Sequence, residues 1–166
     1  MGPVSATTTI DAPRERVCDL IGDLSVRPAF TDHFFSEYRL QRLEPVGVGA
    51  TARFQLDGSG KWMETVIVEI DAPHIVREEG RGGRGNRVRC YTVWELVEGP
   101  SAEICDVTVT FWTESDQLVD RIKQPLKGSR WFSRGWRRAL ARLKDVAESE
   151  APVERVAVAG ADALGL

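Results

Sequence analysis

The chain has 166 residues, of which 42% are hydrophobic and 28% charged, and its formal net charge is −3 at pH 7. This length and apolar content can bury one sizeable core, so we expect a single domain. The slight acidic excess argues against a general nucleic-acid or anionic-membrane binder, which usually needs a basic surplus. No run approaches the roughly 18 apolar residues of a spanning helix, and the first residues lack a secretory signal pattern, so we expect a soluble, cytoplasmic protein.

The first third of the chain predicts a strand followed by two helices. Residues 4–10 alternate with a period of two and are rich in β-branched types, which favours a strand. Asp11 lies within capping reach of a helix that begins near Pro13, a residue suited to the first turn. Apolar residues then follow at helical spacing: Val17, Leu20, Ile21 and Leu24. A second, short helix is expected over residues 27–34.

The middle of the chain changes to a period of two and predicts a meander. Turn residues separate six predicted strands, at 38–43, 50–56, 62–70, 75–79, 87–98 and 103–113. Because short turns join consecutive strands, we expect neighbouring strands to pair antiparallel. Several of these strands are apolar on both faces, so part of the sheet is either covered on both sides or lines an interior space.

The last predicted element is a helix over residues 129–148, after an irregular connector at 115–128. Its apolar residues fall in one stripe that includes Phe132 and Trp136, whereas its arginines point away from that stripe. At about 1.5 Å per residue such a helix is long enough to cross the predicted sheet. We assign residues 1–148 to the domain and expect residues 149–166 to form a mobile tail.

Residues 80–85 read GRGGRG, which fits the dinucleotide fingerprint G-x-G-x-x-G and also looks like the Arg-Gly repeats of RNA-binding tails. A nucleotide site needs these glycines between a strand and a helix, and here they lie between two predicted strands. RNA-binding repeats are longer and contain aromatic residues. We therefore predict a flexible hairpin loop that binds neither a nucleotide nor nucleic acid. An open alternative is a mobile rim whose arginines recognise an anionic group on a ligand.

Three cysteines and two histidines offer little material for a metal site. Cys18, Cys90 and Cys105 lack the paired spacing of zinc or redox motifs, so we expect reduced thiols packed as small apolar residues. The sequence predicts no cofactor.

Three stretches carry a family resemblance: Ile10-Asp-Ala-Pro13 at the first helix, Val48-Gly49-Ala50 before a strand, and residues 138–144 of the last helix. With the order of the elements, they resemble the SRPBCC superfamily, also called START-like or helix-grip proteins, and most closely its polyketide cyclase/dehydratase branch. The resemblance covers residues 1–148. It implies an α+β helix-grip fold, in which a curved antiparallel sheet of six or seven strands wraps around the long C-terminal helix, with two short helices after strand one.

The resemblance also implies an apolar cavity between sheet and helix that binds a lipid, a polyketide or another hydrophobic small molecule. Large aromatic side chains suit such a cavity, although they also serve as plain core. The predicted ligand-binding residues are Phe30, Phe54, Trp62, Tyr91, Trp94, Trp112, Phe132 and Trp136. Because both faces of several strands are apolar, the sequence leaves open which face points inward.

Two other functions are alternatives to ligand binding or carriage. A cyclase or dehydratase without metal or nucleotide would need a sheltered acid–base group, and the candidates are His33, Glu64 and Asp106. An interaction protein would instead use the basic face of the last helix, with Arg134, Arg137 and Arg138. The sequence does not indicate the oligomeric state.

Overall fold

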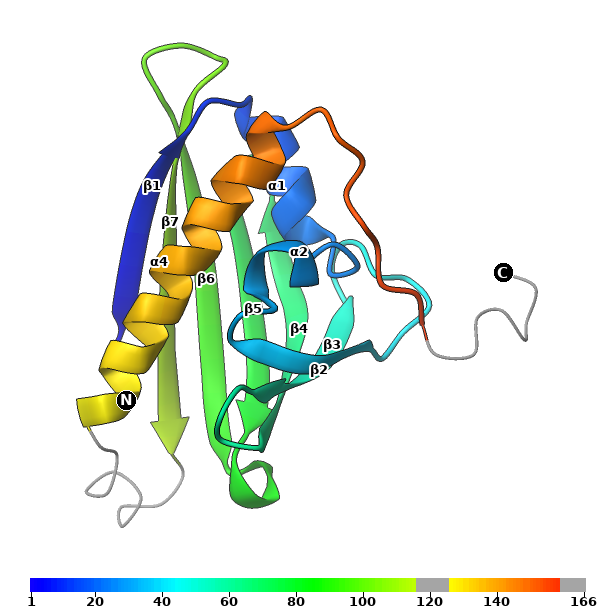
Figure 1. Ribbon diagram of the computed structural model, residues 1–166, viewed down its shortest axis with the longest axis vertical. Helices are drawn as coiled ribbons and strands as arrows, with labels where there is room; N and C mark the ends of the chain where they lie inside the picture. Colours follow the sequence, from blue (N-terminus) through cyan, green and yellow to red (C-terminus); the bar gives the residue numbers. More distant parts are fainter. Residues whose placement is uncertain (116–125, 159–166) are drawn as a thin grey trace.

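The computed structural model describes residues 1–115 and 126–158, and it confirms the predicted α+β helix-grip fold (Figure 1). Seven strands form one antiparallel sheet in the order β1-β7-β6-β5-β4-β3-β2. The strands are β1 (Val4–Ile10), β2 (Phe35–Leu40), β3 (Thr51–Leu56), β4 (Lys61–Asp71), β5 (Ile75–Gly82), β6 (Val88–Glu98) and β7 (Cys105–Ser115). The helices are α1 (Arg14–Gly22), α2 (Pro28–Thr31) and α4 (Leu126–Glu148). Residues 116–125 of the predicted connector lie outside the described residues.

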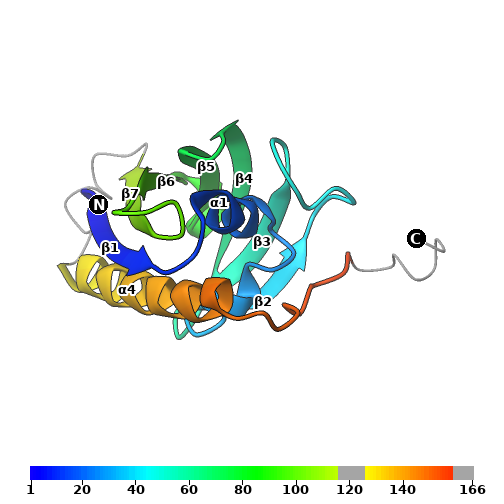
Figure 2. The ribbon, with the colours of Figure 1, turned by 90° about the horizontal axis from the view of Figure 1, so that it is seen from above.

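The sheet curves around the helices. Seen from above, it bends around α1, while α4 runs along the open side from β1 toward β2 (Figure 2). In α4 the predicted apolar stripe is buried, with Trp136 and Leu143 almost fully enclosed, and Arg134 and Arg137 are exposed. The helix therefore closes the concave side of the sheet with its apolar face and turns its basic face outward.

Alternation along the strands decides what faces the core. In β7, Val107, Val109 and Phe111 are buried, and the residues between them are half-exposed. In β6, Thr92 lies opposite Phe111 and both are buried. The first strand of the meander, β2, covers residues 35–40 rather than the predicted 38–43.

The start of α1 differs from the prediction. Pro13 occupies the N-cap and no side chain caps the helix within the described residues, so Asp11 does not have the predicted role. Its backbone N–H instead donates to the carboxylate of Glu148, at 2.7 Å. The chain before α1 is thereby tied to the end of α4. The second helix, α2, is shorter than predicted and contains only residues 28–31.

The GRGGRG stretch is also only partly the predicted loop. Strand β5 runs to Gly82, so the first half of the motif is extended and only residues 83–87 turn, through the short 3-10 helix η1 (Arg84–Asn86). Gly80 is needed inside the strand, because a Cβ there would overlap the carbonyl oxygen of Glu64 on β4. Gly80 therefore lets β4 and β5 approach closely, and its role is not to make a loop flexible.

Residues 149–158, the beginning of the predicted tail, follow the surface beside the first two helices. The Val156 N–H donates to the carbonyl of Ser25 at 2.9 Å, and Arg155 pairs with the buried Asp23 at 2.8 Å. Val158 packs against the core. Residues 159–166 lie outside the described residues.

Gly135 marks a tight contact between α4 and the segment after α2. A Cβ at this position would lie 2.7 Å from a ring carbon of Phe34, and that ring packs on Trp136 with centroids 5.2 Å apart. We predict that Gly135→Ala lowers the free energy of unfolding by about 1–3 kcal/mol, because overpacking outweighs the better helix propensity of alanine. Urea unfolding followed by circular dichroism measures the change.

Gly128→Ala is the matched control on the same helix. Its added Cβ would make only an ordinary contact, 3.8 Å from the sulfur of Met1. This variant should be as stable as the wild type or more stable by up to about 1 kcal/mol. Equal effects of the two substitutions would contradict the tight contact at Gly135.

Candidate functional site

The space between the sheet and α4 is largely filled by aromatic side chains. Trp136 of α4 packs edge-on against Trp94 of β6, with ring centroids 5.5 Å apart and planes at 87°. Trp94 makes a similar contact with Phe30 of α2 at 6.3 Å, and Phe111 of β7 lies 5.8 Å from Trp136. All four side chains are buried. They join helix and sheet into one apolar cluster.

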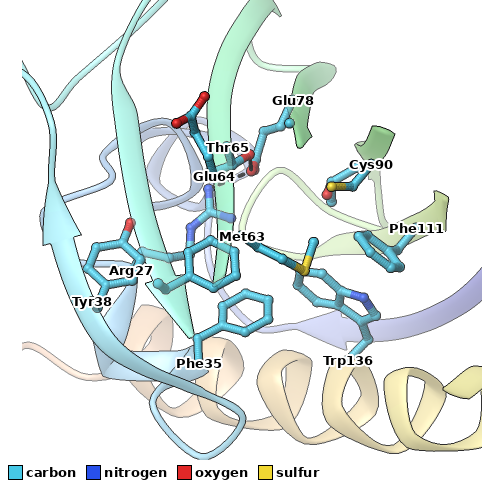
Figure 3. A pocket seen from close by; sticks show the side chains of 13 residues that line it. Arg27, Phe35, Tyr38, Met63, Glu64, Thr65, Glu78, Cys90, Phe111 and Trp136 are labelled. Carbon is cyan, nitrogen blue, oxygen red and sulfur yellow. Dashed lines mark hydrogen bonds and ion pairs between the residues drawn. The ribbon is translucent and has the colours of Figure 1, made fainter. Parts of the chain in front are cut away.

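A small inner cavity remains beside this cluster (Figure 3). Its volume is about 20 Å³, roughly what one water molecule needs. Its apolar wall comes from Phe35, Phe54, Met63, Cys90, Phe111 and Trp136, and its polar wall includes Arg27, Tyr38, Thr65, Glu78 and Thr92. The cavity is therefore small, with an apolar wall that is largely aromatic and a polar wall beside it (Figure 3).

A buried ion pair forms the centre of the polar wall. Arg27, between α1 and α2, places Nη2 at 2.8 Å from Oε1 of Glu78 on β5, and both side chains are 3% exposed. The indole of Trp94 donates to the same oxygen at 2.8 Å, and the hydroxyl of Thr65 donates to Oε2 at 2.9 Å. Arg27 Nη2 also donates to the carbonyl of Ile21 at 2.7 Å. These hydrogen bonds offset the cost of burying both charges.

Sequence reasoning missed this pair, although β5 contains a signal for it. The charged neighbours Arg77, Glu79 and Arg81 are exposed on the outer face, which leaves Glu78 on the same face as the buried Val76. A lone carboxylate on an apolar strand face needs a buried cation. The partner lies far away in the sequence, in the turn before α2, where nothing in the local pattern distinguishes it from a surface arginine.

Two N–H groups of the cavity wall have no hydrogen-bond partner. They are Arg27 Nε and Trp136 Nε1, which are both buried and unpaired among the residues that the structure describes. The guanidinium of Arg27 lies over the rings of Phe30 and Trp94, at 5.5 and 5.2 Å from their centroids. Aromatic faces stabilise its charge but do not replace an oxygen acceptor for Nε–H.

The titratable hydroxyl and thiol of the wall stay protonated at neutral pH. Burial raises the pKa of Cys90 to about 12. Burial likewise raises the pKa of Tyr38 well above its ordinary value, and its hydroxyl donates to the carbonyl of Leu24 at 3.0 Å. Formation of the thiolate or the phenolate is therefore disfavoured near neutral pH.

A second space, the outer hollow, adjoins the inner cavity at the end of the sheet near the start of α4. Its volume is about 210 Å³, and Met1, Leu56, Val88 and Phe132 belong to its largely apolar wall. Met63 and Cys90 line both spaces, so these two side chains form the partition between them. Methionine has three rotatable side-chain bonds. Met63 is therefore the more adaptable of the two shared side chains.

The family follows from comparison with known sequences. A family model described as polyketide cyclase / dehydrase and lipid transport matches residues 1–148. The chain belongs to this family. A search of the curated proteins gives no significant match.

Solved structures agree with this assignment at the level of the fold. A protein from Chromobacterium violaceum is 17% identical with a TM-score of 0.64, and the match covers 90% of this chain and 100% of that one. Major latex-like protein 151 from Panax ginseng is 16% identical with a TM-score of 0.68, covering 89% and 98%. A protein from Thermus thermophilus is 18% identical with a TM-score of 0.63, covering 89% and 100%. Within the described residues, no helix has the length and apolar content to cross a membrane.

The aromatic residues predicted to bind ligand divide between two faces in this member of the polyketide cyclase / dehydrase and lipid transport family. Phe30, Phe54, Trp94, Phe132 and Trp136 are buried between sheet and helices. Phe54 and Trp136 line the inner cavity, and Phe132 lines the outer hollow. These positions agree with a ligand site, and their part in binding stays a prediction.

Trp62, Tyr91 and Trp112 lie on the outer face of the sheet rather than between the sheet and α4. Tyr91 stacks on Trp112 with centroids 5.0 Å apart, and the guanidinium of Arg53 lies 4.7 Å from the centroid of Trp62. Strand alternation explains the difference: the neighbour Cys90 points inward, so Tyr91 points outward. None of these three rings lines the inner cavity or the outer hollow.

The carboxylates predicted to be catalytic also lie on the outer face. Glu64 belongs to the cavity wall, but its carboxylate points away from α4 (Figure 3). Asp106 of β7 lies opposite Thr9 of β1 and accepts a hydrogen bond from its hydroxyl at 2.5 Å. Neither carboxylate reaches the inner cavity.

His33 lies outside the cavity wall, at the junction of the α2 segment with α4. Its Nε2 is 3.0 Å from the carbonyl of Gly135, and Arg142 Nη1 is 3.4 Å from its Nδ1. Because a guanidinium can only donate, Nδ1 accepts and Nε2 carries the proton that it donates to Gly135. Burial lowers the pKa of His33, and the charges of Arg138 and Arg142 act in the same direction. The three predicted catalytic residues are thus not brought together.

We predict that breaking the buried ion pair is costly. Glu78→Leu should lower the free energy of unfolding by about 3–5 kcal/mol, because Arg27 is left as an uncompensated buried charge. The double variant Arg27→Met/Glu78→Leu should be more stable than the sum of the two single changes indicates. Chemical unfolding of the four proteins in this cycle gives the coupling.

An exposed ion pair provides the control for this cycle. Arg77 and Glu69 are 3.0 Å apart, with side chains 46% and 54% exposed. Glu69→Ala should cost less than about 1 kcal/mol. If Glu78→Leu lowers the free energy of unfolding no more than Glu69→Ala does, the buried pair does not stabilise the fold more than an exposed one.

His33 should make stability depend on pH. The pKa of His33 in the folded protein lies below the ordinary value of about 6.5. At a pH between these two pKa values, His33 is protonated in the unfolded chain and neutral in the folded protein. Stability should therefore fall as the pH decreases from 7 toward 5. Melting temperatures measured across this range should show a smaller decrease for His33→Gln, whereas the variant of the exposed His74, His74→Gln, should follow the wild type. Parallel curves for all three proteins would exclude His33 as the source.

Proposed function

We propose that this protein binds a hydrophobic small molecule, of lipid, polyketide or aromatic character, between the sheet and α4. The observation that supports the proposal most is the inner cavity, with its largely aromatic apolar wall, next to a larger apolar hollow, with Met63 and Cys90 lining both spaces. Burial of apolar ligand surface in such a space supplies the binding free energy, and a few polar groups set the orientation. The family description, polyketide cyclase / dehydrase and lipid transport, agrees with this chemistry.

Binding must be accompanied by opening of the partition. Pockets that enclose a small molecule usually have volumes of about 300–1,000 Å³, whereas the inner cavity has about 20 Å³ and the outer hollow about 210 Å³. Displacement of Met63 would merge the two spaces. The ligand would then replace the contacts that Met63 makes in the closed state, so association is expected to be slower than for a preformed pocket.

The polar wall favours binding or carriage over catalysis. A cyclase or dehydratase needs a group that exchanges protons with its substrate. In the inner cavity both oxygens of Glu78 already accept hydrogen bonds, and Tyr38 and Cys90 are held protonated. We therefore assign these polar groups to orienting a ligand rather than to transforming it.

The proposal predicts saturable binding of a neutral apolar fluorophore, N-phenyl-1-naphthylamine. Its emission should increase and shift to the blue with a defined stoichiometry. Met63→Ala, which removes part of the partition, should tighten binding several-fold. Cys90→Leu, which adds bulk at the same place, should weaken binding several-fold. Fluorescence titration gives the dissociation constants.

Val66→Ala is the control, because Val66 lies on β4 but on the opposite face from Met63 and lines neither space. This variant should bind the fluorophore as the wild type does. The proposal fails if the wild type shows no saturable binding, or if Val66→Ala changes the affinity as much as Met63→Ala does.

A further inference from the structure

The indole N–H of Trp136 is an unused donor inside the ligand space. Trp136 is 2% exposed, lines the inner cavity, and its Nε1 has no partner among the described residues. The nitrogen lies on the side of the ring toward Phe111, whose centroid is 5.8 Å from that of Trp136 (Figure 3). An aromatic face is a much weaker acceptor than an oxygen. A buried indole N–H usually finds an acceptor, so a missing one calls for an explanation.

Arg27 supplies a second unused donor in the same wall. Its Nε is buried without a partner within the described part of the chain, whereas its Nη2 is engaged by Glu78 and by the carbonyl of Ile21. Indole and guanidinium nitrogens donate and never accept. The unpartnered side-chain atoms of the cavity wall are therefore both donors, and the complementary ligand group is an acceptor.

The charge of the wall favours a neutral ligand. The positive charge of Arg27 is already balanced by Glu78 at 2.8 Å, so neither a carboxylate nor an ammonium group would find an uncompensated counter-charge. Transfer of a charged ligand from water into this closed space would lose its hydration without a matching ion pair. A neutral oxygen loses far less on desolvation and accepts the same hydrogen bond.

We infer that the ligand is a neutral apolar molecule with a ketone- or quinone-type oxygen that accepts a hydrogen bond from Trp136 Nε1, and that Arg27 Nε serves a second oxygen. This inference rests on the proposed function and narrows its ligand class. Under this inference α4 contributes a hydrogen-bond donor to the ligand as well as an apolar face. The donor belongs to the apolar wall of the inner cavity, beside Phe111 (Figure 3).

Three naphthalenes of similar size test the inference: 2-acetylnaphthalene, 2-isopropylnaphthalene and 2-naphthoate. The ketone should bind the wild type about 3- to 10-fold more tightly than the hydrocarbon, the range expected for one net hydrogen bond. It should also bind more tightly than the carboxylate. In Trp136→Phe, which keeps an aromatic ring but removes the donor, the preference for the ketone should disappear while hydrocarbon binding remains. Trp131→Phe, outside the cavity wall, should keep the preference.

A second measurement does not depend on how well the variant folds. In ¹H–¹⁵N spectra of the wild type, the side-chain N–H of Trp136 should move downfield with the ketone and not with the hydrocarbon. Equal binding of ketone and hydrocarbon, or a ketone preference that survives Trp136→Phe without an indole shift, would overturn the inference while the binding function stands. Failure of all three compounds to bind the wild type would instead overturn the proposed function itself.

Discussion

The buried pair of Arg27 and Glu78 is the constraint on which the arrangement of the interior depends. It ties the turn between α1 and α2 to β5, in the middle of the sheet, through a contact that excludes water. Glu78 also holds the indole of Trp94, and Trp94 packs edge-on against Trp136 of α4. The position of the Glu78 carboxylate therefore affects, through Trp94, how Trp136 and α4 pack on the sheet. A hydrophobic replacement of the pair could preserve stability, but it would not orient these rings in the same way.

The interior combines tight packing with a weak partition. Aromatic rings from the sheet and the helices contact one another around Trp136, which leaves little free volume in the closed state. The outer hollow is separated from this cluster by Met63, a side chain that can change rotamer without moving the backbone. Under the proposed function, displacement of Met63 would create space for a ligand while the sheet and α4 keep their contacts. Such a displacement would open a pocket without disrupting the packing of the core.

The helices and strands could be predicted because their apolar residues recur with a clear period. The side chains of the candidate site were harder to predict, because residue type alone does not show which face of a strand is buried. The apolar stripe of α4 and the alternation along β7 are visible in the sequence and agree with the structure. The sequence does not decide that Trp62 and Tyr91 lie on the outer face, because both faces of their strands carry large apolar residues and a shift of one residue reverses the assignment. Glu78 was overlooked among charged neighbours, since the residue type alone does not distinguish a buried carboxylate from an exposed one.

Under the proposed function, the polar wall would orient a ligand through hydrogen bonds. Arg27 and Glu78 neutralise one another, and burial disfavours deprotonation of Tyr38 and Cys90, so this ion pair leaves no net charge in the wall while its donors can still form directional hydrogen bonds. An enzyme built on this frame would need Glu78 to face the ligand, which requires that the guanidinium or the Thr65 hydroxyl no longer engage it. Because those contacts also position the aromatic cluster, freeing the carboxylate would loosen the core. A catalytic role for Glu78 would therefore come at a cost in stability.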